Sequence, residues 1–193
     1  MIENIFSALN KAKETLSNFL KEKENLQKID KISQEITKCF KNGNKVIICG
    51  NGGSAADAMH FAEEFTGNFR KKRAALPVIA LTDSSHITCV ANDFGFSKIF
   101  SRGIEAFGKK NDILIVLSTS GNSGNIIEAV QKAKQNKLKT ISFLGKTGGK
   151  LKNSCVHEII IPGDFSDRIQ ELHMLILHIV IEIVERYMFP ENY

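Results

Sequence analysis

From residue 45 to residue 188 the sequence alternates short apolar runs with longer helical patterns, and this alternation constrains the fold most. The apolar runs predict strands at 45–49, 77–82, 113–118, 139–144 and 157–161. The segments between and after them predict helices at 54–66, about 84–92, 97–107, 124–136, about 148–153 and 166–188. Short apolar strands separated by helices are typical of a parallel sheet with both faces covered. We therefore predict an α/β fold with three layers, αβα.

Two further helices are predicted before the first strand, over residues 3–41, where two apolar stripes follow helical spacing. The stripes are Ile5, Leu9, Ala12, Leu16, Phe19 and Leu20, and then Leu26, Ile29, Ile32, Ile36 and Phe40. We expect these helices to pack outside the sheet or against another subunit. The 193 residues fit one domain, with N-terminal helices at 1–41 and an α/β core at 45–188.

Composition and charge exclude several classes of protein. No apolar run reaches the roughly 18 residues of a membrane span, and no signal-peptide pattern precedes residue 17. The four cysteines form no C-x-x-C pair, which favours reduced thiols in a cytoplasmic protein. The net charge of +5 comes from scattered lysines, and we interpret the Lys71-Lys72-Arg73 run as a solvated loop. We expect neither a nucleic-acid nor a membrane partner, whereas an anionic small substrate would suit the charge.

The loops that follow the predicted strands are the expected ligand site, because parallel sheets bind ligands beyond their carboxyl ends. These loops read "CGNGGS", "LTDSS", "LSTSGNSGN", "LGKTGG" and "PGDFSD". The first matches the dinucleotide fingerprint G-x-G-x-x-A, but the next acidic residue at a strand end is Asp83, about 30 positions on rather than about 20. We therefore reject dinucleotide binding, and expect the glycines to let backbone N–H groups approach a ligand and Ser54 to cap the helix.

The third loop, residues 118–124, predicts a phosphate site. A buried strand runs into "STSGNSG" and a helix starts there, so hydroxyls, backbone N–H groups and a helix N-terminus converge. No Gly-Lys-Ser/Thr follows, which excludes a Walker loop. Ordinary turn and cap chemistry uses the same residue types, but four hydroxyls in six residues exceed what a cap needs.

Two pairs of polar residues at helical spacing are candidates for a metal site. His60 and Glu64 lie four apart on one predicted helix, while Gln170 and His178 lie eight apart on the apolar last helix. Imidazole and carboxylate ligands suit zinc, and an open position would make it catalytic. Taken singly, each could be a hydrogen-bonded core residue or a solvated charge, and the spacing alone leaves both interpretations open. We give His86, His157 and His173 only the ordinary structural interpretation.

Four motifs together resemble the bacterial phosphoheptose isomerases, which are sugar isomerase (SIS) domain proteins. They are "CGNGGSAADAMHFAEEFTG", "ANDFGF", "STSGNS" and "DRIQELHMLILH", and the resemblance runs nearly end to end. "STSGNS" alone would indicate only a SIS domain. Relatives often carry Gln at the position of Met59 and Arg at that of Asn68, differences that bear on fine specificity only.

The resemblance implies a five-stranded parallel sheet in flavodoxin-like order with an N-terminal helical extension. It implies an aldose–ketose isomerase that converts D-sedoheptulose 7-phosphate into D-glycero-D-manno-heptose 7-phosphate through an enediol. This is the first step towards the ADP-heptose of the lipopolysaccharide core. The family also implies a cytoplasmic homotetramer with sites between subunits and one zinc ion per subunit.

Site residues follow from the same resemblance, position by position. The implied zinc ligands are His60, Glu64, Gln170 and His178. Glu64 would also be the catalytic base and His178 the catalytic acid. The implied substrate contacts are Asn51, Gly52, Gly53, Glu64, Asn92, Asp93 and Gln170, with Ser118, Thr119, Ser120 and Ser123 around the phosphate.

Three other functions compete with this one. A SIS paralogue associates with the replication initiator DnaA, but the equivalents of Glu64 and His178 are replaced in it. SIS isomerases of pentose phosphates usually differ in the last helix, where this chain has Gln170 and His178. A regulatory protein that only binds a sugar phosphate would need no acid–base pair.

Overall fold

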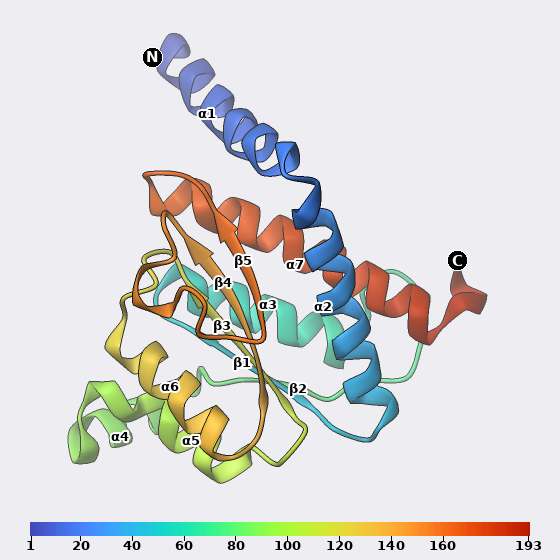
Figure 1. Cartoon of the computed structure of the whole chain (residues 1–193), viewed down its shortest axis with the longest axis vertical. Helices are drawn as coiled ribbons and strands as arrows, with labels where there is room; N and C mark the ends of the chain where they lie inside the picture. Colours follow the sequence, from blue (N-terminus) through green and yellow to red (C-terminus); the bar gives the residue numbers. More distant parts are fainter.

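A computed structural model describes all residues, 1–193, and its centre is a five-stranded parallel sheet (Figure 1). The strands are β1 (Val46–Gly50), β2 (Val78–Ala80), β3 (Ile113–Ser118), β4 (Lys139–Gly145) and β5 (His157–Ile161). Their order in the sheet is β2-β1-β3-β4-β5, and every neighbouring pair is parallel. The predicted fold class and strand order are confirmed.

Helices cover both faces of the sheet, as the buried strands require. The long helices are α1 (Ile2–Lys21), α2 (Lys23–Lys41), α3 (Gly53–Thr66), α4 (Ser84–Phe94), α5 (Ile99–Phe107), α6 (Gly124–Gln135) and α7 (Ser166–Met188). In Figure 1, α2, α3 and α7 lie on one face and α4, α5 and α6 on the other. Successive strand residues alternate between the layers, since Ile48 packs in the α3–α7 core and Ile47 in the α5–α6 core.

The two leading helices differ in their packing. Helix α2 packs on α7, and its stripe residues Ile32 and Ile36 are fully buried. Helix α1 extends away from the body in Figure 1, and of its residues only Phe19 is buried, whereas Ile5 and Leu9 are exposed. No helix is both long enough and apolar enough to cross a membrane.

Three sequence predictions need correction. Ser54 does not cap the helix after the first loop, because α3 begins at Gly53 and its N-cap residue is Gly52. The helix expected at about 148–153 is only a 3₁₀ turn, Gly149–Leu151, because Gly148 and Gly149 have φ of +85° and +57°, outside the right-handed helical region. The Lys71-Lys72-Arg73 run is only partly solvated. Lys71 and Lys72 are exposed, but the side chain of Arg73 is 1% exposed because it pairs with Glu185 of α7.

Candidate active site

Three of the predicted site residues meet where α3 packs against α7. His60 and Glu64 lie one turn apart on α3, and His178 faces them from α7. The Nε2 atom of His60 is 3.3 Å from Glu64 Oε1 and 3.4 Å from His178 Nε2, and His178 Nε2 is 4.0 Å from Glu64 Oε1. The sequence placed two of these residues on one helix face, and the fold adds the third from 114 or more positions away.

This trio fits a zinc ion by its chemistry and its spacing. Ligand atoms about 2.1 Å from a tetrahedral zinc ion lie about 3.4 Å apart. The potential ligand atoms of His60, Glu64 and His178 all lie within 4.8 Å of one another. Two imidazoles and one carboxylate would leave a fourth position open, as in catalytic zinc sites.

The surroundings of His178 favour its neutral form. Burial lowers the pKa of His178, the neighbouring His60 and Arg70 lower it further, and Glu64 acts in the opposite direction. Phe69 stacks on the imidazole, with ring centroids 5.8 Å apart and planes 21° from parallel. A neutral imidazole can coordinate a metal or donate an N–H hydrogen bond.

Gln170 lies apart from the trio within one chain. It precedes His178 by eight residues, about 12 Å along the helix. Its Nε2 donates to Ser54 Oγ over 3.3 Å, and its amide packs against Gly53. A Cβ at Gly53 would lie 2.6 Å from Gln170 Oε1, so a larger residue at position 53 would displace the Gln170 amide. Gln170 therefore belongs to the glycine-rich loop in the single chain.

The first and third loops enclose a small cavity of about 60 Å³. It is lined by Asn51, Ser54, Leu117, Ser118, Thr119, Ser120, Ser123 and Gln170. Six of these eight residues are predicted substrate or phosphate contacts, so the fold brings most of that set together. Because the cavity is lined mainly by hydroxyl and amide groups, it suits an anion that accepts hydrogen bonds.

The hydroxyls of the third loop differ in what they bind. Ser118 Oγ accepts from Gly121 N over 3.1 Å, and Ser120 Oγ accepts from Asn122 N over 3.2 Å. Thr119 Oγ1 lies 3.1 Å from Ser166 Oγ at the start of α7. Ser123 is the N-cap residue of α6, but its side chain makes no cap hydrogen bond. The Ser123 hydroxyl and the α6 N-terminus are therefore available to an anion.

The loop after β4 holds the third loop in shape. Gly121 has φ of +64°, and a Cβ on it would lie 1.9 Å from the carbonyl oxygen of Gly148. The side-chain oxygen of Asn122 accepts from Lys150 N over 3.0 Å. The backbones approach so closely that only glycine fits at position 121.

Asn125 is a site residue that sequence reasoning missed. Its amide exchanges two hydrogen bonds with the amide of Asn51, of 2.9 Å and 2.8 Å, and it is buried on the first turn of α6. This pair joins the glycine-rich loop to α6, the helix that follows the third loop. One polar residue in an ordinary helical pattern gives no signal for such a contact.

Asp57 was also missed, although it lies one turn before His60 on α3. Its Oδ2 atom is buried and has no hydrogen-bond partner. Burial raises the pKa of Asp57 to about 6, and the positive charge of His60 acts against this rise. The i, i+3 spacing to His60 was the signal available in the sequence.

Asn92 and Asp93 are not brought to the loops within one chain. They lie on α4, in the layer opposite α3 and α7, and both are exposed (Figure 1). Asn92 Nδ2 donates to Asp93 Oδ1 over 2.8 Å, and Asp93 accepts a longer contact from Cys89 Sγ. No hydrogen bond links them to the loops after β1 and β3.

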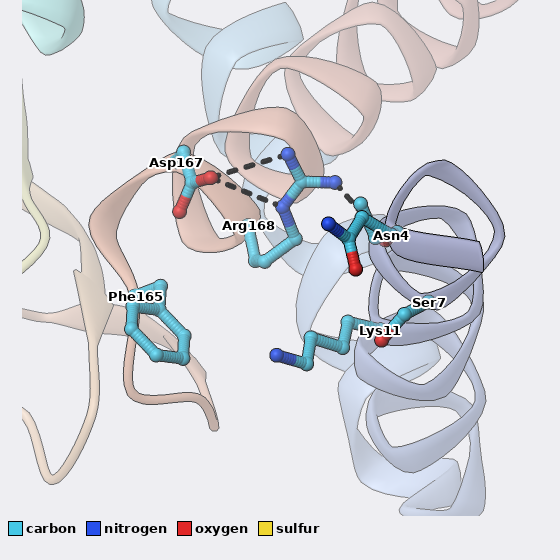
Figure 2. Close-up of a pocket in the computed structure, with 7 residues that line it drawn as sticks. Asn4, Ser7, Lys11, Phe165, Asp167 and Arg168 are labelled. Atoms are coloured by element: carbon cyan, nitrogen blue, oxygen red, sulfur yellow. Dashed lines mark hydrogen bonds and ion pairs between the residues drawn. The ribbon is translucent and has the colours of Figure 1, made fainter. Parts of the chain in front are cut away.

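Larger clefts lie elsewhere, between α1 and the start of α7. Two adjoining clefts of about 350 and 390 Å³ share Lys11, Phe165 and Arg168 in their linings. Figure 2 shows Asn4, Ser7 and Lys11 on α1 facing Phe165 and Arg168, with Arg168 paired to Asp167. Arg168 already contacts two carboxylates, those of Asp167 and Glu171, so its charge is largely compensated within the chain.

Comparison with known proteins extends over almost the whole chain. The SIS domain family model matches residues 9–145. The chain is 57% identical over 190 residues to a phosphoheptose isomerase of Fusobacterium nucleatum, covering 98% of both chains. It is 50% identical to one of Yersinia enterocolitica, covering 95% of this chain and 96% of that protein.

Solved structures give the same result at lower sequence identity. A phosphoheptose isomerase from Francisella tularensis superimposes with a TM-score of 0.90 at 35% identity, covering 96% of this chain and 98% of that one. Phosphoheptose isomerase GmhA from Neisseria gonorrhoeae gives a TM-score of 0.89 at 34% identity, covering 95% and 97%.

Proposed function

The chain belongs to the phosphoheptose isomerase family of SIS-domain proteins, and from this premise we propose that His60, Glu64 and His178 form its catalytic centre. The enzyme is an aldose–ketose isomerase that converts D-sedoheptulose 7-phosphate into D-glycero-D-manno-heptose 7-phosphate, for ADP-heptose synthesis. The observation that carries the proposed centre is the approach of one carboxylate and two imidazoles, with their closest atoms 3.3–4.0 Å apart.

The reaction moves a proton between C1 and C2 of the open-chain sugar through an enediol. The Glu64 carboxylate removes a proton from C1 and returns it to C2. The His178 ring donates a proton to the C2 oxygen as the enediol forms, and accepts one from the C1 oxygen as the enediol collapses to the aldehyde. Because a proton carrier cannot also be a permanently tight metal ligand, we expect Glu64 and His178 to be loosely or alternately ligated.

We propose zinc as the metal, one ion per subunit, held by His60, Glu64 and His178 of one chain. When bound, the ion polarises the carbonyl and hydroxyl oxygens as a Lewis acid. The fourth predicted ligand, Gln170, is about 12 Å along α7 from His178, so it would have to come from a second copy. Asn92 and Asp93 would likewise reach the substrate from another subunit, which supports the predicted homotetramer with shared sites.

The phosphate end of the sugar is held by the loop after β3. We propose that Ser118, Thr119, Ser120 and Ser123 and the N-terminus of α6 bind it. Asn51, Gly52 and Gly53 lie beside this loop and would contact the sugar together with Gln170. Binding energy from the phosphate, far from the reacting carbons, positions C1 and C2 against Glu64.

The test is turnover in D2O, followed by NMR. The protein is incubated with sedoheptulose 7-phosphate after chelator treatment, with and without added zinc. We expect an aldose heptose 7-phosphate that carries deuterium at C2, formed only with metal. Turnover that is unchanged after chelation would overturn the metal assignment, and no turnover under any condition would overturn the isomerase.

A DnaA-associating or purely regulatory role is disfavoured by the same site. Glu64 and His178 are both present, and the fold places them against each other on two packed helices. A protein that only binds a sugar phosphate would need the hydroxyl loop but not this pair. A pull-down with DnaA is the experiment if no isomerisation is found.

A further inference from the structure

A buried ion pair joins the far ends of the two helices that carry the catalytic centre. Arg73 follows α3 in the segment that passes beside the C-terminal end of α7 (Figure 1). Its Nε donates to Glu185 Oε1, near the end of α7, over 2.6 Å. The two side chains are 1% and 2% exposed, so the pair is removed from water. Such a pair stabilises little compared with apolar packing, and breaking it by removing one partner is costly.

The rest of the Arg73 guanidinium binds the end of α3. Its Nη2 donates to the carbonyl of Glu64 over 2.6 Å, and its Nη1 donates to the carbonyls of Phe65 and Gly67 over 2.7 and 3.1 Å. The last carbonyls of a helix have no partner within the helix. Arg73 therefore caps α3 and directly holds the peptide group of Glu64.

Glu185 in turn is held on both of its oxygens. Its second oxygen, Oε2, accepts from the hydroxyl of Tyr193 over 2.8 Å. Burial and the Glu185 carboxylate raise the pKa of Tyr193 to about 12, so the phenol remains a donor at neutral pH. The carboxylate thus has a fixed orientation between Arg73 and Tyr193.

The position of this pair relates it to the catalytic centre. Glu185 follows His178 by seven residues, which is two helical turns and about 10 Å on nearly the same face of α7. Arg73 bonds the backbone of Glu64 itself. The base on α3 and the acid on α7 are therefore connected through one guanidinium and one carboxylate.

We propose that Arg73 and Glu185 are positioning residues, which fix α3 against α7 so that Glu64 and His178 keep their separation. The inference rests on the proposed function and adds two residues that touch neither substrate nor metal. The planar guanidinium donates in several fixed directions at once, which lysine cannot do. A displacement of about 1 Å at a catalytic group can cost about 100-fold in rate.

The test compares Glu185→Gln and Arg73→Lys with a matched control, Asp112→Asn. Asp112 is also a buried carboxylate paired with a cation, Lys45, but its side-chain hydrogen bonds come only from Asn44, Lys45 and Lys109, none of which lies on α3 or α7. For each protein we would measure kcat, KM for sedoheptulose 7-phosphate, thermal stability, and zinc affinity by competition with a chromogenic chelator.

We expect Glu185→Gln and Arg73→Lys to lower kcat by about 10- to 100-fold and to weaken zinc binding. KM should change by less than about threefold, because the phosphate loop is anchored elsewhere. Asp112→Asn should lose stability but keep wild-type kcat and zinc affinity. A merely structural role for Arg73 would give all three variants the same profile.

Four outcomes are decisive. Folded Glu185→Gln and Arg73→Lys proteins with wild-type kcat and zinc affinity would overturn the positioning role, and so would equal losses in Asp112→Asn. If those variants do not fold, Tyr193→Phe removes one hydrogen bond from Glu185, and should lower kcat about threefold with unchanged KM; an unchanged kcat would overturn the proposal. Inactivity of the wild-type chain would instead reject the proposed function.

Discussion

The two ends of the sheet both carry buried polar groups, but they satisfy them differently. At the amino end, the Asp112 carboxylate accepts hydrogen bonds from Lys45 N, Lys45 Nζ, Asn44 Nδ2 and Lys109 N. Burial alone would raise the pKa of Asp112, but the bonds from Lys45 and Lys109 together lower it. Every lone-pair direction of this carboxylate is used within the protein.

At the carboxyl end, hydrogen-bonding capacity is left over. The Ser123 hydroxyl makes no cap bond, and Asp57 near the start of α3 has a buried oxygen without a partner. Farther along α3, the side chains of His60, Glu64 and His178 pair mainly with one another. Unsatisfied buried groups cost stability. The difference teaches that the amino end is built for stability, whereas the carboxyl end keeps its capacity for a ligand.

The largest effect is expected for Glu64→Gln, which should change activity without changing stability. We expect kcat to fall by about 10²- to 10⁴-fold, because an amide cannot remove the C1 proton. In metal-free protein the free energy of unfolding should change by less than about 0.5 kcal/mol, since Glu64 contacts only the two histidines through its carboxylate. Turnover assays and urea denaturation measure the two effects. Full activity in this variant would refute the assignment of Glu64 as the base.

Asp112→Asn tests the amino end of the sheet. Removing the charge leaves the Lys45 ammonium and two backbone donors facing a neutral amide, so we expect a loss of about 3 kcal/mol in the free energy of unfolding. The kcat of the folded protein should stay at the wild-type value. Denaturant unfolding and turnover of the same preparation test this, and a stability equal to wild type would contradict the account of the amino end.

His173 is an intermediate case, because one of its two ring nitrogens has a hydrogen-bond partner and the other has none. Its Nε2 donates to the carbonyl of Leu144 over 3.0 Å, while its buried Nδ1 has no partner. Burial lowers the pKa of His173 to about 4, and the Leu144 bond acts weakly against this. Between about pH 6.5 and 4 the His173 imidazole therefore binds a proton in the unfolded chain but not in the folded chain. The stability that neutral His173 contributes is fully present above about pH 6.5 and is lost as the pH falls towards 4.

His173→Gln should remove this pH dependence. Relative to the variant, wild type should lose up to about 1.4 kcal/mol per pH unit below about pH 6. The pKa of Asp57, raised to about 6, works in the opposite direction in the same range, but it cancels in the difference between the two proteins. Urea denaturation of metal-free protein between about pH 5 and 7 measures the slope. Parallel curves would show that His173 is not buried in its neutral form.

The smallest effect is expected for Ser123→Ala. One hydroxyl bond to a phosphate would be lost, which should raise KM about tenfold and leave stability unchanged. Ser33→Ala is the control, because the Ser33 hydroxyl only bonds the carbonyl of Ile29 within α2. Steady-state kinetics on the two variants separates them. A KM that rises equally in both would remove Ser123 from the phosphate site.

Much of the fold could be predicted from local pattern. The predicted bounds of β3, β5 and α7 agree with the structure, because apolar runs and helical periodicity are strong there. Strand β2 is shorter than predicted, Val78–Ala80, since it lies at the sheet edge and pairs with β1 alone. The turn at Gly148 shows the opposite case, where positive φ values end a helical pattern that spacing alone supported.

The site could be predicted only in parts. Residues four apart on one helix, such as His60 and Glu64, are within reach of sequence reasoning. The Asn51–Asn125 amide pair and the Arg73–Glu185 ion pair join segments 74 and 112 positions apart, and no local pattern encodes them. Gln170 is instructive, since helical phase places it on the side of His178 but helical rise places it about 12 Å away.

That rise fixes the distances between the two parts of the site along α3 and α7. Ser54, in the cavity lining, precedes His60 by six positions on α3, about 9 Å, and Gln170 precedes His178 by eight on α7, about 12 Å. Rigid helices, not loops, therefore set the distance between the proposed phosphate loop and the proposed proton-transfer pair of one chain. Where one chain supplies both the phosphate loop and the proton-transfer pair for a sugar, the fixed distance between them selects sugars of matching length. Each carbon removed from the sugar would draw the reacting end back from Glu64 while the phosphate stays in place.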